Sequence, residues 1–261
     1  MPELPDVQVY KEYIDATSLH QSIESIDVMD ARILRNVSKD QLIQTLSGQP
    51  LDETHRHGKY LFIHTGSKQL LMMHFGMTGS LKYYKEDSDE PEYTQVRFDF
   101  DNGYHLAYVC KRMLGQVQLV EDIKQFLSDH DIGPDALRLN RDEFRNILGT
   151  SRAMIKPTFM DQSKLAGIGN EYSDEILFQA GIHPRKQATD LNSDQLDDLF
   201  DQTHDVCTTA IENRIEWDKF PDSYLVRHRE KGANCPICGG TIDTMKINSR
   251  TCYYCPQHQS Q

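Results

Sequence analysis

The sequence predicts an α+β protein in three parts: an N-terminal helix with an antiparallel β-sandwich, a helical domain, and a C-terminal β-hairpin that holds a metal. Three observations support this fold class. Short segments rich in β-branched and aromatic residues recur between positions 60 and 120, separated by turn-forming residues. From about position 128 the apolar residues change to helical spacing. Four of the six cysteines fall between positions 235 and 255. We therefore expect domains at 1–127, 128–222 and 223–261.

The first part is predicted to begin with a helix, because apolar side chains in residues 3–14 recur at helical spacing. The segments that follow alternate or cluster apolar residues in the manner of strands. They are YLFIHT (60–65), KQLLMMHF (68–75), TQVRFDF (94–100), YHLAYV (104–109) and GQVQLV (115–120). Five or more short strands favour a sandwich or a barrel.

The middle part is predicted to be helical. Asn140 and Glu143 have the spacing of a capping box, which marks a helix start. Residues 192–214 carry one continuous apolar stripe, as an amphipathic helix does. After Pro221, the segment YLVRHR (224–229) has strand character again and leads into the cysteine cluster.

The charge of the chain is unevenly distributed. The formal net charge of −12 taken alone argues against a nucleic-acid partner. However, residues 54–82 contain four basic residues and no acidic one, and residues 225–261 contain five basic residues against two acidic ones. Acidic residues collect in 86–92 and 190–222, which we interpret as solvated faces. The sequence therefore indicates basic islands on an acidic body.

The sequence also indicates the cellular compartment in which the protein works. It has no run of about 18 apolar residues, and its N-terminus lacks a basic stretch followed by an apolar one. We expect neither a membrane span nor a secretory signal. The cysteine spacing indicates a metal site rather than a set of disulfides, so we expect a reducing cytoplasm.

The cysteine cluster is a strong metal signal. Cys235 and Cys238 form one C-x2-C pair. The tail offers a second pair in two ways, Cys252 with Cys255 or Cys255 with His258, and spacing alone does not choose between them. Two such pairs bridged by a hairpin indicate one structural zinc ion. A segment this short buries little core, so the metal would supply folding energy on the order of 10 kcal/mol.

Motifs at both ends and in the middle of the chain together resemble one family. MPELPD opens the chain, HRHGKYL lies in the first third, FMDQSKLAGIGNEYSDEILFQAGIHP lies in the middle, and the cysteine hairpin closes it. In this order, over nearly the whole chain, they resemble the formamidopyrimidine-DNA glycosylase and endonuclease VIII superfamily of DNA repair enzymes. The GIGN and IHP segments and the finger favour the formamidopyrimidine branch. The resemblance implies a helix–two-turn–helix middle domain, a monomer, and damaged double-stranded DNA as the partner.

The resemblance also implies roles for the first residues. Pro2, with Met1 removed, would be the nucleophile of a bifunctional glycosylase and apurinic/apyrimidinic lyase. A secondary amine can attack C1′ of a deoxyribose and form an iminium ion, and an α-amino group has an appreciable neutral fraction at physiological pH. Glu3 would be the acid/base carboxylate. No organic cofactor is needed for this chemistry, because the iminium itself accepts the electrons.

Further residues match the family's DNA contacts. Lys59, Asn170 and Arg250 match residues that hold phosphates, and the zinc finger would position Arg250. Lys156 is expected near the lesion pocket. Two interpretations of His74 stay open: a phosphate contact, and a partly buried histidine with its own hydrogen bonds. Removing a base from the stack leaves a void, and the matching residues that would fill it or read the opposite base are Met77, Arg112 and Leu114.

Four features depart from the family pattern. Asp6 stands where a Glu is usual, and Leu114 replaces a wedging Phe, which reduces stacking. Aligning the finger makes Cys235, Cys238, Cys255 and His258 the zinc ligands and leaves Cys252 as a neighbour. The connection NRIEWDKFPD (213–222) is shorter than the corresponding loop of the formamidopyrimidine branch, which closes over 8-oxoguanine. This shortening makes ring-opened purines or oxidised pyrimidines plausible substrates.

The sequence therefore predicts a DNA glycosylase and lyase of base excision repair. One alternative is an endonuclease VIII-like enzyme that prefers oxidised pyrimidines. Two others are a catalytically silent protein that binds damaged DNA and a zinc-ribbon interaction module. The joint presence of the residues that match the catalytic and phosphate-binding positions argues against loss of catalysis.

Overall fold

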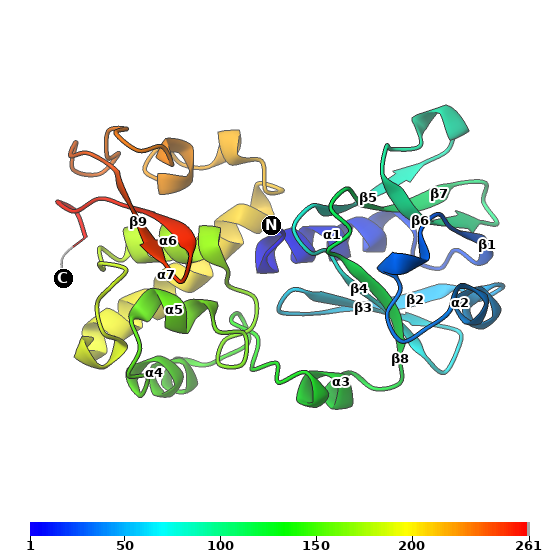
Figure 1. Ribbon diagram of the computed structural model, residues 1–261, viewed down its shortest axis with the longest axis horizontal. Coiled ribbons are helices and arrows are strands. Elements are labelled where there is room, and N and C mark those ends of the chain that lie inside the picture. Colours follow the sequence, from blue (N-terminus) through cyan, green and yellow to red (C-terminus); the bar gives the residue numbers. More distant parts are fainter. Residues whose placement is uncertain (260–261) are drawn as a thin grey trace. The chain divides into compact units, whose positions relative to one another are not determined.

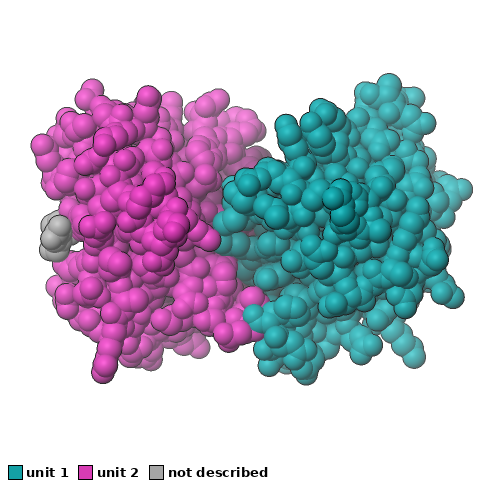
Figure 2. All heavy atoms as spheres, in the orientation of Figure 1, with its two compact units in different colours: residues 1–2, 6–130 teal, residues 3–5, 131–261 magenta. Residues whose placement is uncertain are grey.

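A computed structural model describes residues 1–259 of the chain. The chain forms two compact units, which Figure 2 distinguishes by colour. Unit 1 contains residues 1–2 and 6–130, and unit 2 contains residues 3–5 together with the chain from 131 onward. The division at 130/131 lies close to the predicted boundary at 127/128. Residues 223–259 belong to unit 2.

Unit 1 is a helix with an antiparallel β-sandwich, which confirms the predicted fold class (Figure 1). One sheet has the strand order β1-β6-β7-β5 and the other β2-β3-β4-β8. The strands are β1 Ile23–Val28, β2 Leu51–His57, β3 Tyr60–Thr65, β4 Leu70–His74, β5 Gly79–Tyr84, β6 Thr94–Phe100, β7 His105–Cys110 and β8 Gln116–Val120. The helices are α1 Leu4–Thr17, α2 Lys39–Leu46 and α3 Ile123–Asp129, with 3-10 turns η1 Ala31–Ile33 and η2 Asp87–Asp89.

The core of unit 1 comes from the inner faces of both sheets and one face of α1. Val7 and Ile14 of α1 are fully buried in the same apolar cluster as Leu61, Phe98 and Tyr108. All five predicted strand segments contain a strand, and two of them, 60–65 and 94–100, have the predicted bounds. β1, β2 and β5 and the helix α2 were not predicted.

Unit 2 combines the helical domain with the cysteine hairpin. Its helices are α4 Arg141–Gly149, α5 Ile155–Met160, α6 Asn170–Gln179 and α7 Ser193–Glu212. Three-residue and four-residue 3-10 turns also occur, namely η3 Ala188–Asp190, η4 Trp217–Lys219 and η5 Leu225–His228. The hairpin consists of β9 Asp243–Ile247 and β10 Arg250–Tyr254.

Local sequence explains two of these helices. α4 begins with the predicted capping box, because the Asn140 side chain accepts from the Glu143 N–H and the Glu143 side chain accepts from the Asn140 N–H. A second capping box, formed by Asn192 and Gln195, begins α7. Five members of the predicted stripe of α7 are buried and two, Phe200 and Ile211, are half-buried; the buried members are Leu196, Leu199, Val206, Cys207 and Ala210.

One predicted strand is wrong. YLVRHR forms the 3-10 turn η5 rather than a strand. The buried carboxylate of Glu175 accepts the N–H groups of Leu225 at 3.0 Å and Val226 at 2.7 Å. Strand pairing would require these donors, so a contact from a distant helix overrides the local preference. Among residues 1–259, no helix is long and apolar enough to cross a membrane.

Candidate active site and nucleic-acid interface

Some of the predicted site residues lie on unit 1 and others lie on unit 2. On unit 2, the N-terminal segment is anchored by the Glu3 carboxylate, which is 1% exposed. This carboxylate accepts backbone N–H groups from Gly169 at 2.6 Å, Glu171 at 3.0 Å and Tyr172 at 3.4 Å. These donors belong to the first turn of α6 and its cap, where N–H groups lack partners within the helix. Glu3 therefore acts as the cap of a helix more than 160 positions away.

The loop before α6 is shaped to receive this segment. The Leu4 N–H donates to the Gly167 carbonyl at 3.0 Å. Gly167 has a φ of +114°, and a Cβ there would lie 2.6 Å from a Leu4 methyl carbon. The side chain of Gln162 accepts from the Gly167 N–H and donates to the Ile168 carbonyl. Gly167 of the GIGN motif thus allows close backbone approach to the N-terminal segment.

Asn170 lies at the start of α6, as predicted. Its Nδ2 donates to the Thr251 carbonyl of β10 at 3.0 Å, and its Oδ1 is buried without a hydrogen-bond partner among residues 1–259. The N–H groups at this helix start are occupied in part by the Glu3 carboxylate. A DNA contact at this point would therefore use the Asn170 side chain.

Lys156, which is expected near the lesion pocket, lies in the interior of unit 2. Its side chain is fully buried, and its Nζ donates to the Asn170 carbonyl at 2.9 Å, the Ser173 hydroxyl at 2.7 Å and the Asp174 carboxylate at 2.7 Å. Three acceptors use all three donors of an ammonium group. This arrangement speaks against a direct contact of Lys156 with DNA, and it makes the lysine a support of the α6 start.

Arg229 completes this support, and no motif in the sequence marks it. Its guanidinium donates to Asp174 at 2.7 Å and to Glu171 at 3.2 Å, and it stacks over the ring of Tyr253 at 4.8 Å. The Tyr253 N–H also donates to Asp174. Asp174 therefore joins α5, α6, β10 and the segment after η5. No short motif in the sequence marks such partners, which lie up to 79 positions apart.

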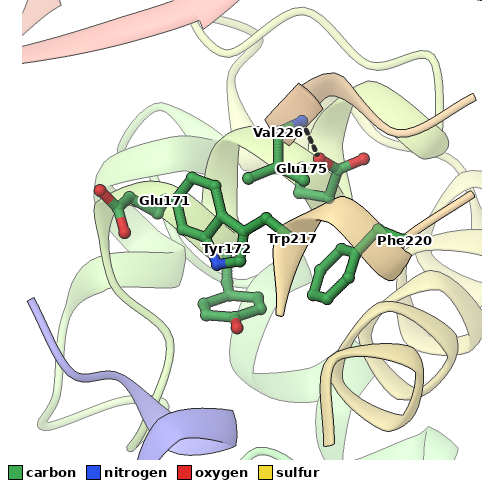
Figure 3. Close-up of a pocket in the computed structure, with 6 residues that line it drawn as sticks. All are labelled: Glu171, Tyr172, Glu175, Trp217, Phe220 and Val226. Carbon is green, nitrogen blue, oxygen red and sulfur yellow. Dashed lines mark hydrogen bonds between the residues drawn. The ribbon is translucent and has the colours of Figure 1, made fainter. Parts of the chain in front are cut away.

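Glu175 is a second buried acid of α6 that no sequence motif marks. It is 3% exposed, and burial raises the pKa of its carboxyl to about 7. Figure 3 shows it beside Val226 at a small apolar pocket that Glu171, Tyr172, Trp217 and Phe220 also line. The pocket lies next to the residues that hold the Glu3 carboxylate.

On unit 1, Lys59 occupies a two-residue hairpin turn between β2 and β3, with Gly58 at a φ of +54°. Its side chain is only 8% exposed. Burial, followed by the Lys59 charge, lowers the pKa of His74 to about 4, so His74 is neutral at physiological pH. The His74 Nδ1 accepts the Gly76 N–H at 3.4 Å, and its ring lies 5.0 Å from that of Tyr60. These contacts favour the second interpretation of His74, a histidine with its own hydrogen bonds.

Three residues are expected to fill the space left by the displaced base or to read the opposite base, and they lie on two adjoining loops of unit 1. Met77 is 41% exposed in the turn before β5, and Leu114 is 49% exposed in the loop between β7 and β8. The Arg112 N–H donates to the Thr78 hydroxyl at 3.1 Å, which joins the two loops. A Cβ on Gly76 would lie 2.4 Å from the Leu114 backbone. The structure therefore brings Met77, Arg112 and Leu114 together on the surface of unit 1.

Arg250 lies at the tip of the C-terminal hairpin. The turn between β9 and β10 consists of Asn248 and Ser249, both with positive φ, so that Ile247 pairs with Arg250. The Arg250 side chain is exposed and makes no hydrogen bond or ion pair with residues 1–259. It is therefore available to bind an anion.

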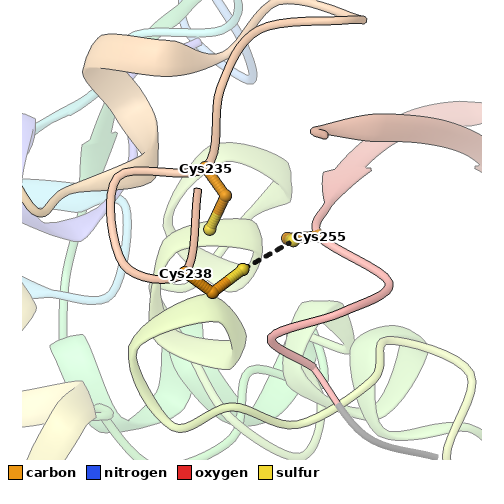
Figure 4. A group of neighbouring side chains, drawn as sticks. All are labelled: Cys235, Cys238 and Cys255. Carbon is orange, nitrogen blue, oxygen red and sulfur yellow. Dashed lines mark hydrogen bonds between the residues drawn. The ribbon is translucent and has the colours of Figure 1, made fainter. Parts of the chain in front are cut away.

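Three of the four predicted zinc ligands lie together (Figure 4). The Sγ atoms of Cys235, Cys238 and Cys255 all lie within 4.8 Å of one another. The Gly240 N–H donates to the Cys238 sulfur and lowers the pKa of that thiol, which favours the thiolate that binds metals. Cys252 is buried outside this group, and its thiol lies near Asp174. These three thiols could hold a metal ion.

His258 is not in this group of ligand atoms. Its Nε2 lies 2.8 Å from the Phe178 carbonyl, and its ring packs on that of Phe178 at 4.9 Å. With Nε2–H donating to the carbonyl, Nδ1 would be left as the nitrogen that can bind a metal.

Comparisons with known proteins agree with this arrangement. Residues 1–117 match the family model of the formamidopyrimidine-DNA glycosylase N-terminal domain, and residues 132–219 match that of its H2TH domain. The chain is 30% identical to the formamidopyrimidine-DNA glycosylase of Desulforamulus reducens and 29% identical to that of Pelotomaculum thermopropionicum, with 99% of each chain covered. It also resembles the Lactococcus lactis formamidopyrimidine-DNA glycosylase bound to DNA with an apurinic/apyrimidinic site (TM-score 0.89, 26% identity, covering 99% of this chain and 100% of that one). The chain belongs to the formamidopyrimidine-DNA glycosylase family.

Proposed function

We propose that this DNA glycosylase is bifunctional, and that Pro2 is the nucleophile for both base release and strand cleavage. One observation carries the proposal: the residue after Pro2 is fixed by three N–H groups of α6. Chain ends ordinarily fray, and a frayed end cannot hold a nucleophile in a reactive geometry. Anchoring through Glu3 keeps the Pro2 amine in a defined position while leaving Pro2 itself partly exposed.

The reaction begins once Met1 is removed. The neutral amine of Pro2 forms a bond to C1′ as the bond between C1′ and the base breaks, and the base leaves with a proton. The sugar ring then opens at its oxygen, which takes up a proton, and the amine becomes an iminium ion. Loss of a C2′ proton to a base follows, and the 3′ phosphate leaves. Glu3 is the proposed acid and base for these proton transfers.

DNA binding would use the cationic and exposed residues of both units. Lys59, Asn170 and Arg250 are the proposed phosphate contacts. Met77 and Leu114 are the proposed wedge, since exposed apolar side chains of this size on adjoining loops have no role in the core. Arg112, beside them, is proposed to read the opposite base. Damaged double-stranded DNA is the proposed partner of a monomeric enzyme in a reducing compartment, and no disulfide occurs among residues 1–259.

We further propose that Cys235, Cys238, Cys255 and His258 hold one structural zinc ion. Three close thiols support this, and so does the commitment of the His258 Nε2 to a backbone carbonyl, because metal-binding histidines usually donate their other N–H in this way. When bound, zinc would stabilise the hairpin that carries Arg250 and would take no part in the chemistry.

Borohydride reduction in the presence of abasic-site DNA tests the nucleophile. We expect a covalent protein–DNA adduct, because reduction traps the iminium. A variant with one residue added before Pro2 should give none, and the same residue added at the C-terminus serves as the control. An adduct that survives the N-terminal extension would refute the role of Pro2. Binding without any adduct would favour a protein that only recognises damage.

A further inference from the structure

The loop between α6 and η3 carries two neighbouring cationic side chains, Arg185 and Lys186, with no partner in the described part of the chain. Arg185 is exposed and Lys186 is half-buried, and neither side chain makes a hydrogen bond or an ion pair with residues 1–259. Other cations of unit 2, such as Arg141 and Arg227, are held by aspartates. In a chain with a formal net charge of −12, two adjacent unpaired cations form a local site that attracts anions.

The same loop contains a buried histidine with one nitrogen left to donate. His183 is 5% exposed, and its Nδ1 accepts the Arg185 N–H at 3.2 Å. Burial, followed by the Arg185 charge, lowers the pKa of His183, so the imidazole is neutral at physiological pH. A neutral imidazole whose Nδ1 accepts carries its proton on Nε2, and this Nε2–H has no hydrogen-bond partner among residues 1–259. The loop therefore offers a hydrogen-bond donor together with two positive charges.

These three side chains meet at one hollow. His183, Arg185 and Lys186 line it together with Gln187 and Asp190. Its volume is about 570 Å³, which is more than a phosphate ion fills and leaves room for groups attached to one. Two cations against one carboxylate leave a single positive charge, which matches the single negative charge of a phosphodiester. Hydrogen bonds from cationic side chains to phosphate oxygens are among the strong ones in proteins.

The loop is held in place without a ligand. The Lys186 carbonyl accepts the Ile155 N–H at 2.8 Å, and the Lys186 N–H donates to the His183 carbonyl at 2.9 Å. The ring of His183 packs edge-on against that of Tyr254, with 5.1 Å between their centroids. Because the backbone and the imidazole are already ordered, an anion that binds here requires little further ordering of the protein.

The hollow is separate from the proposed phosphate contact of Arg250. Tyr254, on which His183 packs, is the last residue of β10, whereas Arg250 is the first. Four residue steps of a strand span about 13 Å. The hollow is therefore a second site rather than an extension of the first.

We propose that this hollow binds one phosphate group, with the His183 Nε2–H and the side chains of Arg185 and Lys186 as donors to its oxygens. The phosphate belongs either to a DNA strand outside the damaged site or to a free phosphate ion, because both present the same oxygens. The inference goes beyond the proposed function and does not depend on the role of Pro2.

Nitrogen-15 labelling of the histidines provides the first test. In NMR spectra of the imidazoles, His183 should show the Nε2–H tautomer, and the variant His183→Gln identifies its signals by their loss. The Nε2 signal should shift saturably as sodium phosphate replaces sodium chloride at constant ionic strength. A signal that does not respond to phosphate would overturn the inference.

The second test is the variant Arg185→Gln, which removes one charge from an exposed position and leaves the core intact. The His183 signal should then need about tenfold more phosphate for its half-maximal shift, because a charged hydrogen bond is lost. Arg138→Gln, which is exposed elsewhere in unit 2 and does not line the hollow, is the matched control and should titrate like the wild type. Equal titrations of the wild type and Arg185→Gln would overturn the site.

Salt titrations of binding to an undamaged duplex identify the source of the phosphate. If a DNA strand supplies it, Arg185→Gln should reduce the slope of log K against log salt by about 0.9, and Arg138→Gln should not. An unchanged slope together with weaker phosphate binding assigns the hollow to free phosphate. If Arg185→Gln changes neither measurement, the inference fails while the proposed function stands. A missing borohydride adduct would instead refute the proposed function and leave this site unaffected.

Discussion

Replacing Lys156 by Met tests whether this lysine stabilises the fold or contacts DNA. The substitution keeps the length and apolar volume of the side chain but removes an ammonium that is fully buried and bonded to Asn170, Ser173 and Asp174. Removing one partner of a buried ion pair costs about 3–5 kcal/mol, because the remaining charge stays buried. For a unit of roughly 130 residues, such a loss lowers the melting temperature by about 10–20 °C.

The assay is urea or thermal unfolding followed by the emission of the single tryptophan, which lies in unit 2. Lys164→Met is the control, because Lys164 is 41% exposed and its ion pair with Asp161 is long, at 3.7 Å. Salt titrations of duplex binding complete the experiment, since each lost phosphate contact reduces the slope of log K against log salt by about 0.9. A Lys156→Met protein of wild-type stability whose slope falls by about one would refute our reasoning and restore the direct DNA contact.

Four further predictions follow from the site. Arg250→Ala should reduce the salt slope of duplex binding by about 0.9, and an unchanged slope would contradict the phosphate contact. Leu114→Phe should tighten binding to lesion duplexes by about 1 kcal/mol through stacking, as measured by competition titration; no gain would place Leu114 away from the bases. Cys238→Ser should abolish zinc retention on dialysis, whereas Cys252→Ala should keep one ion per chain. If metal analysis finds the reverse, Cys252 rather than Cys238 is the ligand. For Glu175, a raised pKa in the folded state means that the unfolded chain loses this proton first. The free energy of unfolding should therefore fall as the pH rises from about 4.5 to about 7, by up to roughly 3 kcal/mol, and Glu175→Gln should remove this dependence.

The parts of the fold that the sequence predicts are those set by local pattern. YLFIHT and TQVRFDF are strands with the expected bounds because β-branched and aromatic residues dominate them. β1, with the sequence IESIDV, and β2, with LDETHRH, were missed, because acidic and histidine side chains on their outer faces obscure the alternation. The capping box at Asn140 needs only four consecutive residues and was predicted correctly.

The parts that the sequence does not predict depend on partners far away in the chain. Lys156 has the composition of a surface residue, and only its contact with Asp174, 18 positions later, shows that it is buried. YLVRHR has strand propensity, and only the Glu175 carboxylate explains its 3-10 turn. The proposed catalytic residues Pro2 and Glu3 were identified by resemblance, since nothing in the pattern MPELPD reveals that α6 holds the Glu3 carboxylate.

The capping of α6 by Glu3 has a consequence for dissecting this enzyme. A fragment cut at the covalent boundary near position 131 would lose the carboxylate and expose the N–H groups of Gly169 and Glu171. The two halves are therefore not interchangeable modules, and recombination between relatives would have to carry the first five residues along with the C-terminal half. A synthetic peptide of those residues should restore helicity to such a fragment.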